Sequence, residues 1–175
     1  INLTQNGCTT NDKNDLAKLR WATGNLKSTG STNYIWAPSQ TEIGYYYAFN
    51  KLYNGSTGDP CSKLNTAYYG TGWRTPSKNE LEKLSRCTDK VFTNNGMWFM
   101  NKSLGVFLKA GGVRQESGSG TNGATYTDHG CYWTSTIGTS KNAYNMEFWN
   151  TEAHVNNTSS WFGLQTNGLL IRCVK

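Results

Sequence analysis

The chain has 175 residues and a formal net charge of +6, and 16% of its residues are charged, against roughly 25% in an average soluble protein. Aromatic residues account for 13%, and this content with so little charge excludes a disordered chain. No stretch approaches the roughly 20 apolar residues of a membrane-spanning helix, so we expect no membrane insertion. Abundant Gly, Asn, Thr and Ser disfavour long helices. The length fits one turn-rich, mostly β domain with a single core.

The basic residues are scattered singly from Lys13 to Lys175, and no two of them are adjacent. Nucleic-acid-binding domains usually gather their Lys and Arg side chains on one face or along one helix. The pattern therefore favours a mildly basic, solvated surface and no nucleic-acid partner. Attraction to acidic glycans stays open.

Five cysteines are spread along the chain without any CxxC pair, which disfavours zinc and thioredoxin-type chemistry. Their dispersal in a chain rich in Asn, Thr and Trp indicates an oxidising compartment. Two disulfides at most can form, and about 15 arrangements stay open, as does the alternative that several cysteines are buried thiols. The sequence begins at Ile1 without a basic or apolar signal segment, so we expect a mature or trimmed exported fragment. The cysteines are Cys8, Cys61, Cys87, Cys131 and Cys173.

One helix is well signalled. Ser77 and Glu80 have the spacing of a capping box just after Pro76, and the apolar positions that follow predict a helix ending near Cys87. We expect residues 1–18 to be an N-terminal extension or a first strand.

A second capping-box spacing, at Ser39 and Glu42, is weaker. The three tyrosines at 45–47 that follow it suit a strand as well as a helix. Alternation would bury Tyr46 or its neighbours, so core packing is favoured over a sugar-stacking surface.

The late segment 143–150 shows the clearest period of two, which is typical of a strand. Tyr144, Met146 and Phe148 should face the core, and the residues between them should face outward. The expected strands are Leu19–Leu26, Gly105–Val113, Cys131–Ser135, Ala143–Asn150 and Leu169–Val174.

Six short segments, in order from Trp21 to the end of the sequence, carry a resemblance. Each motif alone is weak, but six in this order are fairly specific. Together they resemble the Fibrobacter succinogenes major paralogous domain family. The segments are Trp21–Leu26 (WATGNL), Gly72–Leu84 (GWRTPSKNELEKL), Val106–Arg114 (VFLKAGGVR), Tyr132–Thr136 (YWTST), Ala143–Phe148 (AYNMEF) and Gly168–Lys175 (GLLIRCVK).

The resemblance implies one α+β domain over residues 1–175 with a C-type-lectin-like fold. Such a fold has two short helices, small antiparallel sheets and long loops, with the termini near each other on a shared sheet. Family members are secreted or cell-surface proteins common in Bacteroidetes, and some related domains sit at fimbrial tips. The chain could therefore be part of a larger surface or pilus protein. Cousins of the same fold carry hypervariable faces written by diversity-generating retroelements.

The sequence departs from the metal-dependent branches of this fold. It lacks the Glu-Pro-Asn and Gln-Pro-Asp tripeptides of calcium-dependent lectins, and Trp149-Asn150-Thr151 resembles their Trp-Asn-Asp strand without its carboxylate. Formylglycine-generating enzymes and sulfoxide synthases share a related helix motif, but their GNVWEW segment is absent. Glu152 and His154 supply only two ligands, too few for a zinc or iron site. We therefore expect no cofactor and no enzymatic activity, with a formylglycine-generating type of metal enzyme as a distant alternative.

A recognition surface is the remaining hypothesis. Aromatic faces stack on sugars or anchor protein partners, while Asn and Glu orient hydrogen bonds. We expect an extracellular adhesion domain that binds a glycan or a host or microbial surface protein through its late-strand face. A retroelement-diversified receptor-binding protein is the alternative, and Trp161 fits the core equally well. The expected ligand-binding residues are Asn145, Glu147, Trp149, Asn150, Glu152, His154 and Trp161.

Overall fold

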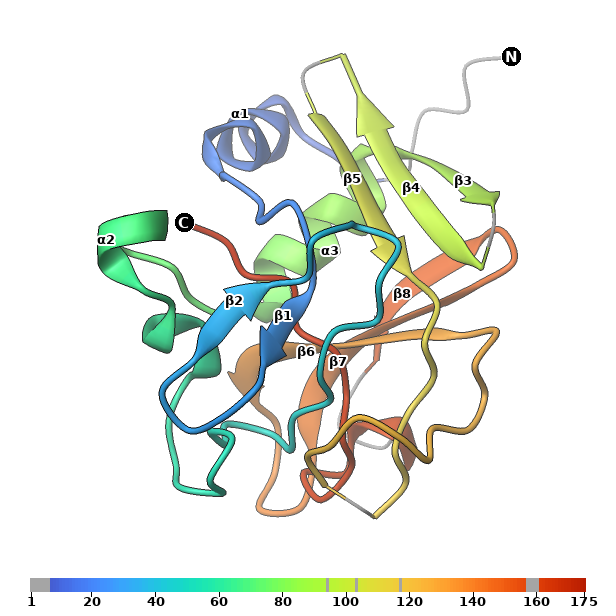
Figure 1. Cartoon of the computed structure of the whole chain (residues 1–175). Coiled ribbons are helices and arrows are strands. Elements are labelled where there is room, and N and C mark those ends of the chain that lie inside the picture. Colours follow the sequence, from blue (N-terminus) through green and yellow to red (C-terminus); the bar gives the residue numbers. More distant parts are fainter. Residues whose placement is uncertain (1–6, 94, 103, 117, 157–160) are drawn as a thin grey trace.

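A computed structural model describes residues 7–93, 95–102, 104–116, 118–156 and 161–175 (Figure 1). Within them, short helices and short strands alternate with long irregular connections. The helical elements are α1 (Thr10–Lys18), η1 (Pro60–Lys63), α2 (Thr66–Tyr69), α3 (Lys78–Cys87) and η2 (Trp161–Gly163), where η marks a 3₁₀ turn. The strands are β1 (Leu26–Ser28), β2 (Tyr34–Trp36), β3 (Asp89–Thr93), β4 (Gly96–Asn101), β5 (Leu104–Lys109), β6 (Gly130–Ile137), β7 (Ala143–Trp149) and β8 (Glu152–Asn156).

The strands form three small antiparallel sheets. One has the order β1-β2, the second β3-β4-β5 and the third β6-β7-β8. Neighbours in each sheet are also neighbours in sequence, so short turns connect the strands (Figure 1). The class is therefore α+β with short helices and small antiparallel sheets, as predicted.

The capping-box helix is confirmed as α3. Ser77 is its N-cap and accepts a hydrogen bond from the Glu80 backbone amide, while the Glu80 side chain accepts from the Ser77 backbone. Leu81 and Leu84 are buried on the face that packs on the sheets. The helix ends at Cys87, where the sequence placed its end.

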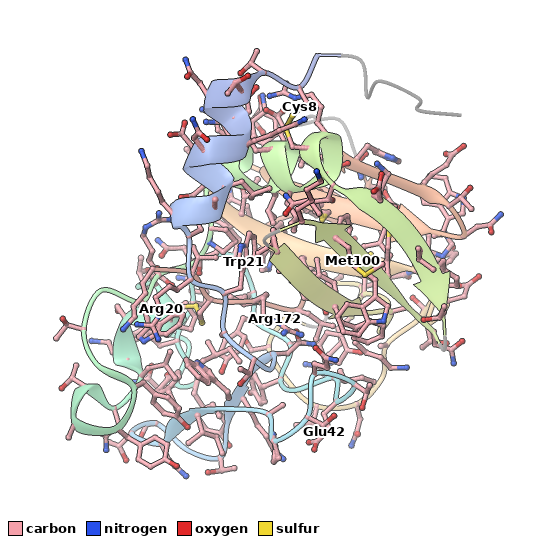
Figure 2. All side chains as sticks on the ribbon, turned by 90° about the horizontal axis from the view of Figure 1, so that it is seen from above. Cys8, Arg20, Trp21, Glu42, Met100 and Arg172 are labelled. Carbon is pink, nitrogen blue, oxygen red and sulfur yellow. A yellow bond between two sulfur atoms is a disulfide. The ribbon has the colours of Figure 1, made fainter. Side chains whose placement is uncertain are left out.

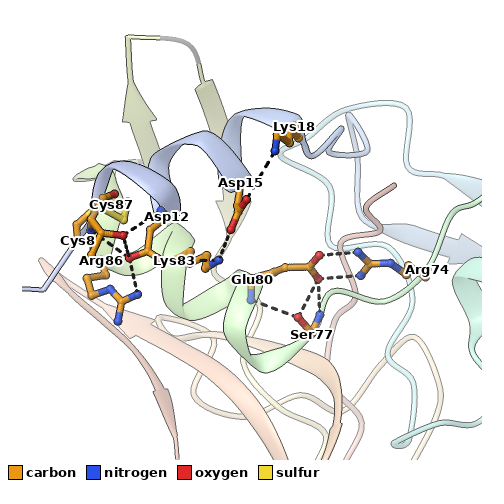
Figure 3. A network of polar contacts seen from close by, with 11 residues as sticks. Cys8, Asp12, Asp15, Lys18, Arg74, Ser77, Glu80, Lys83, Arg86 and Cys87 are labelled. Atoms are coloured by element: carbon orange, nitrogen blue, oxygen red, sulfur yellow. Dashed lines mark hydrogen bonds and ion pairs between the residues drawn. A yellow bond between two sulfur atoms is a disulfide. The ribbon is translucent and has the colours of Figure 1, made fainter.

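Of the two expectations for residues 1–18, the first strand is wrong for Thr10–Lys18, which forms helix α1, while residues 1–6 lie outside the described residues. Thr9 caps α1 with the same reciprocal arrangement, closed by Asp12 instead of Glu. A capping box normally has Glu or Gln at that place, so the shorter side chain hid the signal. A disulfide from Cys8 to Cys87 ties the start of α1 to the end of α3, and ion pairs continue the contact (Figure 3).

The weaker signal at Ser39 does not produce a helix. The segment 39–49 is irregular, and Tyr46 and Tyr47 form isolated bridges to Gly120 and Leu169. All three tyrosines at 45–47 are buried. Core packing of this segment, predicted from alternation, is confirmed.

The segment 20–26, which follows α1, pairs with the C-terminal segment 171–175. The backbone amide of Ala22 donates to Cys173, that of Leu26 donates to Ile171, and Trp21 forms an antiparallel bridge to Val174. The predicted strands at 19–26 and 169–174 are thus extended segments held mainly by isolated bridges. A disulfide from Cys61 to Cys173 fixes the C-terminal segment further.

The core consists of two clusters of buried side chains, and β6 and β7 lie between them. Tyr132, Met146 and Phe148 belong to the cluster that includes Leu81 and Leu84 of α3. Cys131, Trp133 and Ala143 belong to the other cluster, which is rich in Tyr and Trp. Because both faces of this sheet are packed, strand alternation here does not separate buried from exposed side chains.

A buried cation lies near the centre of the molecule (Figure 2). Arg172 is 2% exposed, and its guanidinium donates to Asn25 Oδ1 at 2.9 Å and to the carbonyl of Ala22 at 3.1 Å. Tyr132 donates to the same Asn25 oxygen at 3.1 Å. Burial lowers the pKa of Arg172 and raises that of Tyr132 to about 12.

Candidate binding site

The register of the third sheet places three rows of side chains on one face. Cys131 is paired with Glu147, which is paired with His154, and Trp133 is paired with Asn145, which is paired with Asn156. Trp149 is paired with Glu152 at the open end of the hairpin, and its ring stacks on His129 just before β6. We call this face the grid; its members are His129, Cys131, Trp133, Asn145, Glu147, Trp149, Glu152, His154 and Asn156.

The opposite face of β7 carries Met146 and Phe148, which pack beneath α3 in the core. The predicted alternation is therefore right for these two residues. Tyr144, predicted to face the core with them, is only half-buried, and Lys78 places its ammonium over the Tyr144 ring, 4.3 Å from the centroid.

Two of the predicted site residues are buried, and the expectation that they face solvent is wrong. Asn145 is 0% exposed and Glu147 is 6% exposed. Helix η2 covers this part of the grid: a Cβ added to Gly163 would lie 3.1 Å from Asn145 Oδ1 and 2.7 Å from the Ala143 carbonyl. The Asn145 amide has no hydrogen-bond partner within the part of the chain that the structure describes.

The Glu147 carboxylate is almost completely buried, and it accepts a hydrogen bond from the side-chain amide of a neighbouring residue. Asn156 Nδ2 donates to its Oε2 from the neighbouring strand. No Lys or Arg among the described residues pairs with it. A carboxylate kept from water in this way gains from any nearby cation.

The open end of the grid is aromatic. The rings of His129 and Trp149 stack at 5.3 Å, and His154 meets Trp149 edge-on at 5.2 Å. The centroid of the Tyr126 ring lies 6.0 Å from that of His129 and 6.0 Å from that of Trp161. We call this group the aromatic platform; its members are Tyr126, His129, Trp149, His154, Trp161 and Phe162.

The platform reaches solvent. Tyr126 is 49% exposed and Trp161 is 46% exposed, and His154 is exposed as well. Trp149 and Phe162 are half-buried, and Phe162 packs against the Tyr- and Trp-rich core cluster. Three of the predicted site residues, Trp149, His154 and Trp161, are thus brought into one surface.

The hairpin turn beyond the platform accounts for two further predicted residues. Asn150 is exposed with φ of 50°, a left-handed conformation that Asn tolerates better than most residues. This turn conformation is enough to account for an Asn at position 150, and no ligand is needed to explain it. Glu152 follows the turn and is exposed beside Trp149.

Asp128 adds a second exposed carboxylate at the platform. Its Oδ1 lies 3.0 Å from His129 Nδ1, and this hydrogen bond lowers the pKa of Asp128 below its ordinary value. Together with Glu152 and Glu147, it makes the charged groups of the site acidic. None of the platform and grid residues is a Lys or Arg.

The free thiol of the described chain belongs to Cys131, a buried member of the grid. Cys131 is 0% exposed, and burial raises its pKa well above the ordinary value, with the Glu147 charge acting in the same direction. At neutral pH the group is therefore a protonated thiol, whereas nucleophilic cysteines act as thiolates. Among the residues with described positions, no three His, Cys, Asp or Glu side chains come together to hold a metal ion.

A small pocket lies elsewhere, between the loop before η1 and the middle of β6. It has a volume of about 40 Å³ and is lined in part by Phe49, Asp59 and Thr134, enough for a few water molecules at most. Asp59 there accepts hydrogen bonds from the amide and hydroxyl of Thr75, so its carboxylate is already engaged.

Sequence reasoning missed Tyr126 and His129 as site residues. His129 could have been found by counting: two residues before Cys131, it falls on the same face of the predicted strand. Tyr126 has no such signal, because it comes from an irregular loop and has φ of 54°. No known protein family, curated protein or solved structure matches this chain.

Proposed function

We propose that this chain is a non-catalytic, extracellular recognition domain of C-type-lectin-like fold that binds a glycan or a surface protein through the aromatic platform. The observation that carries the proposal is the exposure of Tyr126 and Trp161 in a ring cluster that includes Trp149. Exposed aromatic clusters are uncommon on surfaces without a partner, and Trp and Tyr are the residues that anchor interfaces most often.

Two features, a pairing of segments and a pair of disulfides, support the fold and location. Residues 20–26 and 171–175 pair with each other near the two ends of the chain, as the family resemblance implies. Two disulfides, Cys8–Cys87 and Cys61–Cys173, fit an oxidising compartment. No described helix is long and apolar enough to cross a membrane.

The chemistry of the site favours binding over catalysis. The thiol of Cys131 is buried and protonated, so it lacks the thiolate character of a nucleophile. His129 is stacked against Trp149 and bonded to Asp128, with no serine or threonine of the platform to activate. The exposed groups offer flat apolar faces and hydrogen-bond acceptors, which suit recognition.

The experiment is a capture assay on a panel of immobilised glycans and extracellular proteins, with wild type and two single variants. Trp161→Ala and Tyr126→Ala remove rings that are about half exposed, so both variants should fold. Tyr68→Ala is the matched control, since Tyr68 is 81% exposed on α2 and lies outside the platform.

We expect the wild type and Tyr68→Ala to capture the same target. Each platform variant should lose about tenfold or more in affinity, as expected for hot-spot aromatics. Capture that is equal for all four proteins would contradict the proposal. So would the absence of any captured target across both halves of the panel.

A further inference from the structure

The charges of the chain are divided unevenly. Between Arg114 and Arg172 there are four acidic residues and one Lys, a net charge of −3, whereas the rest of the chain carries sixteen basic and seven acidic residues, a net charge of +9. All recorded ion pairs of Lys and Arg involve described residues between 12 and 86. The late segment that builds the platform is thus an acidic region of a basic protein.

Three of the four carboxylates of this region lie at or near the platform. Asp128 is bonded to His129, Glu152 is paired with Trp149 across the hairpin, and Glu147 is one row deeper on the grid. None of the three has a Lys or Arg partner within the described positions. Glu147 is in addition more than nine-tenths buried. The hydrogen bond from the Asn156 amide compensates the buried negative charge less well than a cation would.

Aromatic faces beside carboxylates form a favourable environment for a cation. The ring quadrupole attracts a positive charge within about 6 Å of the ring centre, most strongly for Trp. A guanidinium also stacks on aromatic rings and forms paired hydrogen bonds with a carboxylate. Trp149 is paired with Glu152 across the hairpin, and Asp128 is bonded to His129, whose ring stacks on Trp149.

We infer that the platform receives an Arg or Lys side chain from a basic segment of a partner protein. The inference rests on the proposed function and narrows its ligand. The cationic head would lie over the exposed face of one of the platform rings. Glu152 and Asp128 would accept its hydrogen bonds. Charge complementarity favours this occupant over an acidic glycan, which the three carboxylates would repel.

The test uses short repeat peptides as probes, with capped ends and Gly spacers. The repeated residue is Arg, Lys, Gln or Glu, and binding is followed by amide and indole NMR shifts at low salt. We expect the Arg and Lys peptides to bind and to move the indole signals of Trp149 and Trp161. The Gln and Glu peptides should leave those signals in place.

Charge-removing variants identify the carboxylates. Glu152→Gln and Asp128→Asn should each weaken binding of the Arg peptide by about three- to fivefold. Glu82→Gln is the matched control because Glu82 lies on α3, which packs on the opposite face of the sheet, and it should change affinity by less than about twofold. Added salt should weaken binding of wild type more than that of Glu152→Gln.

Four outcomes would overturn the inference. The Gln peptide could bind as well as the Arg peptide, or Glu152→Gln could behave like Glu82→Gln. Glucosamine oligosaccharides could bind where Arg peptides do not, which would make the occupant a cationic glycan. Sedimentation could show self-association that Glu152→Gln abolishes, which would make it a second copy of this chain. If target capture still depends on Trp161 in any of these cases, the proposed function stands and the cationic protein ligand alone is rejected.

Discussion

His129 lies just before β6 and Trp149 ends β7, and the centroids of their stacked rings are 5.3 Å apart with an interplanar angle of 28°. The stack joins the start of β6 to the end of β7 at the edge of the sheet. Trp149 is half-buried by it and by the edge contact with His154. The ring therefore supports the platform as well as contributing to its surface.

This double role predicts a difference between two Trp variants. Trp149→Ala should lower the free energy of unfolding by about 2–4 kcal/mol, because it removes a packed ring and leaves a gap. Trp161→Ala removes a ring that is 46% exposed and should cost about 1 kcal/mol or less. Urea unfolding of the two variants checks this, and equal losses would show that Trp149 is not a support. Trp161→Ala is therefore the better variant for testing binding, because a loss of affinity in it is less easily confused with a loss of stability.

The residues of β7 show how far sequence can lead. The period of two correctly separated Asn145 and Glu147 from Met146 and Phe148, since alternation is a property of the strand itself. The alternation could not show that η2 covers Asn145. The covering turn, which contains Gly163, is separate from the strand in the sequence and is brought to it by the fold. Which face a side chain occupies was predictable, and its exposure was not.

The helices make the same point. The Ser77 capping box predicted α3 within a residue because the signal is local. Helix α1 was missed because its capping box has Asp12 in place of Glu or Gln. The disulfide that ties it to α3 at Cys87 is a long-range contact, which local sequence does not reveal. The platform needed three segments brought together by the fold, and so Tyr126 could not be predicted from pattern.

Glu80 should make stability depend on acid pH. Burial alone would raise the pKa of Glu80, but hydrogen bonds from Arg74 and Ser77 outweigh it and lower the pKa (Figure 3). Because the folded-state pKa is the lower one, ionised Glu80 stabilises the fold above its unfolded pKa, about 4.3. This contribution is lost as the pH falls through the folded-state value.

Glu80→Gln keeps the capping box but should lower stability at pH 7 by about 1–2 kcal/mol, through the lost ion pair with Arg74. It should also flatten the fall in unfolding free energy below pH about 4.3. Denaturant unfolding across this pH range measures both effects. Glu82→Gln on the same helix is the control and should stay within about 0.5 kcal/mol of wild type. An unchanged acid slope in Glu80→Gln would contradict the assignment.

The cysteine arrangement predicts a thiol count. Cys131 is fully buried and its pKa is raised by burial, so a thiol reagent should label no cysteine in the folded protein at neutral pH. One equivalent should react after unfolding without reductant. Labelling of Cys131 before unfolding would contradict its burial, and more than one reactive thiol after unfolding would contradict the disulfides Cys8–Cys87 and Cys61–Cys173.

The disulfides should also differ from the thiol in their effect on stability. Replacing Cys8 and Cys87 together by Ser should cost about 2–5 kcal/mol, because the cross-link closes a loop of 79 residues in the unfolded chain. Cys131→Ala leaves every cross-link in place and removes one buried sulfur, which should cost about 1–2 kcal/mol. Thermal unfolding of the two variants compares these losses, and a larger loss for Cys131→Ala would contradict the ranking.

The buried cation in the core gives the sharpest stability test. Asn25 accepts hydrogen bonds from Arg172 and Tyr132, and its own amide donates to the carbonyls of Glu42 and Ile43 at 3.2 and 3.0 Å. Asn25→Leu has a similar size but removes all four bonds and leaves Arg172 with a charge that two backbone carbonyls alone must solvate. Breaking such a buried polar arrangement costs about 3–5 kcal/mol.

Asn122→Leu is the control, because Asn122 is exposed in an irregular loop and its replacement should change stability by less than about 0.5 kcal/mol. The double variant Asn25→Leu with Arg172→Met removes the cation together with its acceptor. It should recover part of the loss, since an apolar pair no longer strands a charge in the core. A double variant no more stable than Asn25→Leu would mean that packing around Asn25, and not the stranded charge of Arg172, sets the cost.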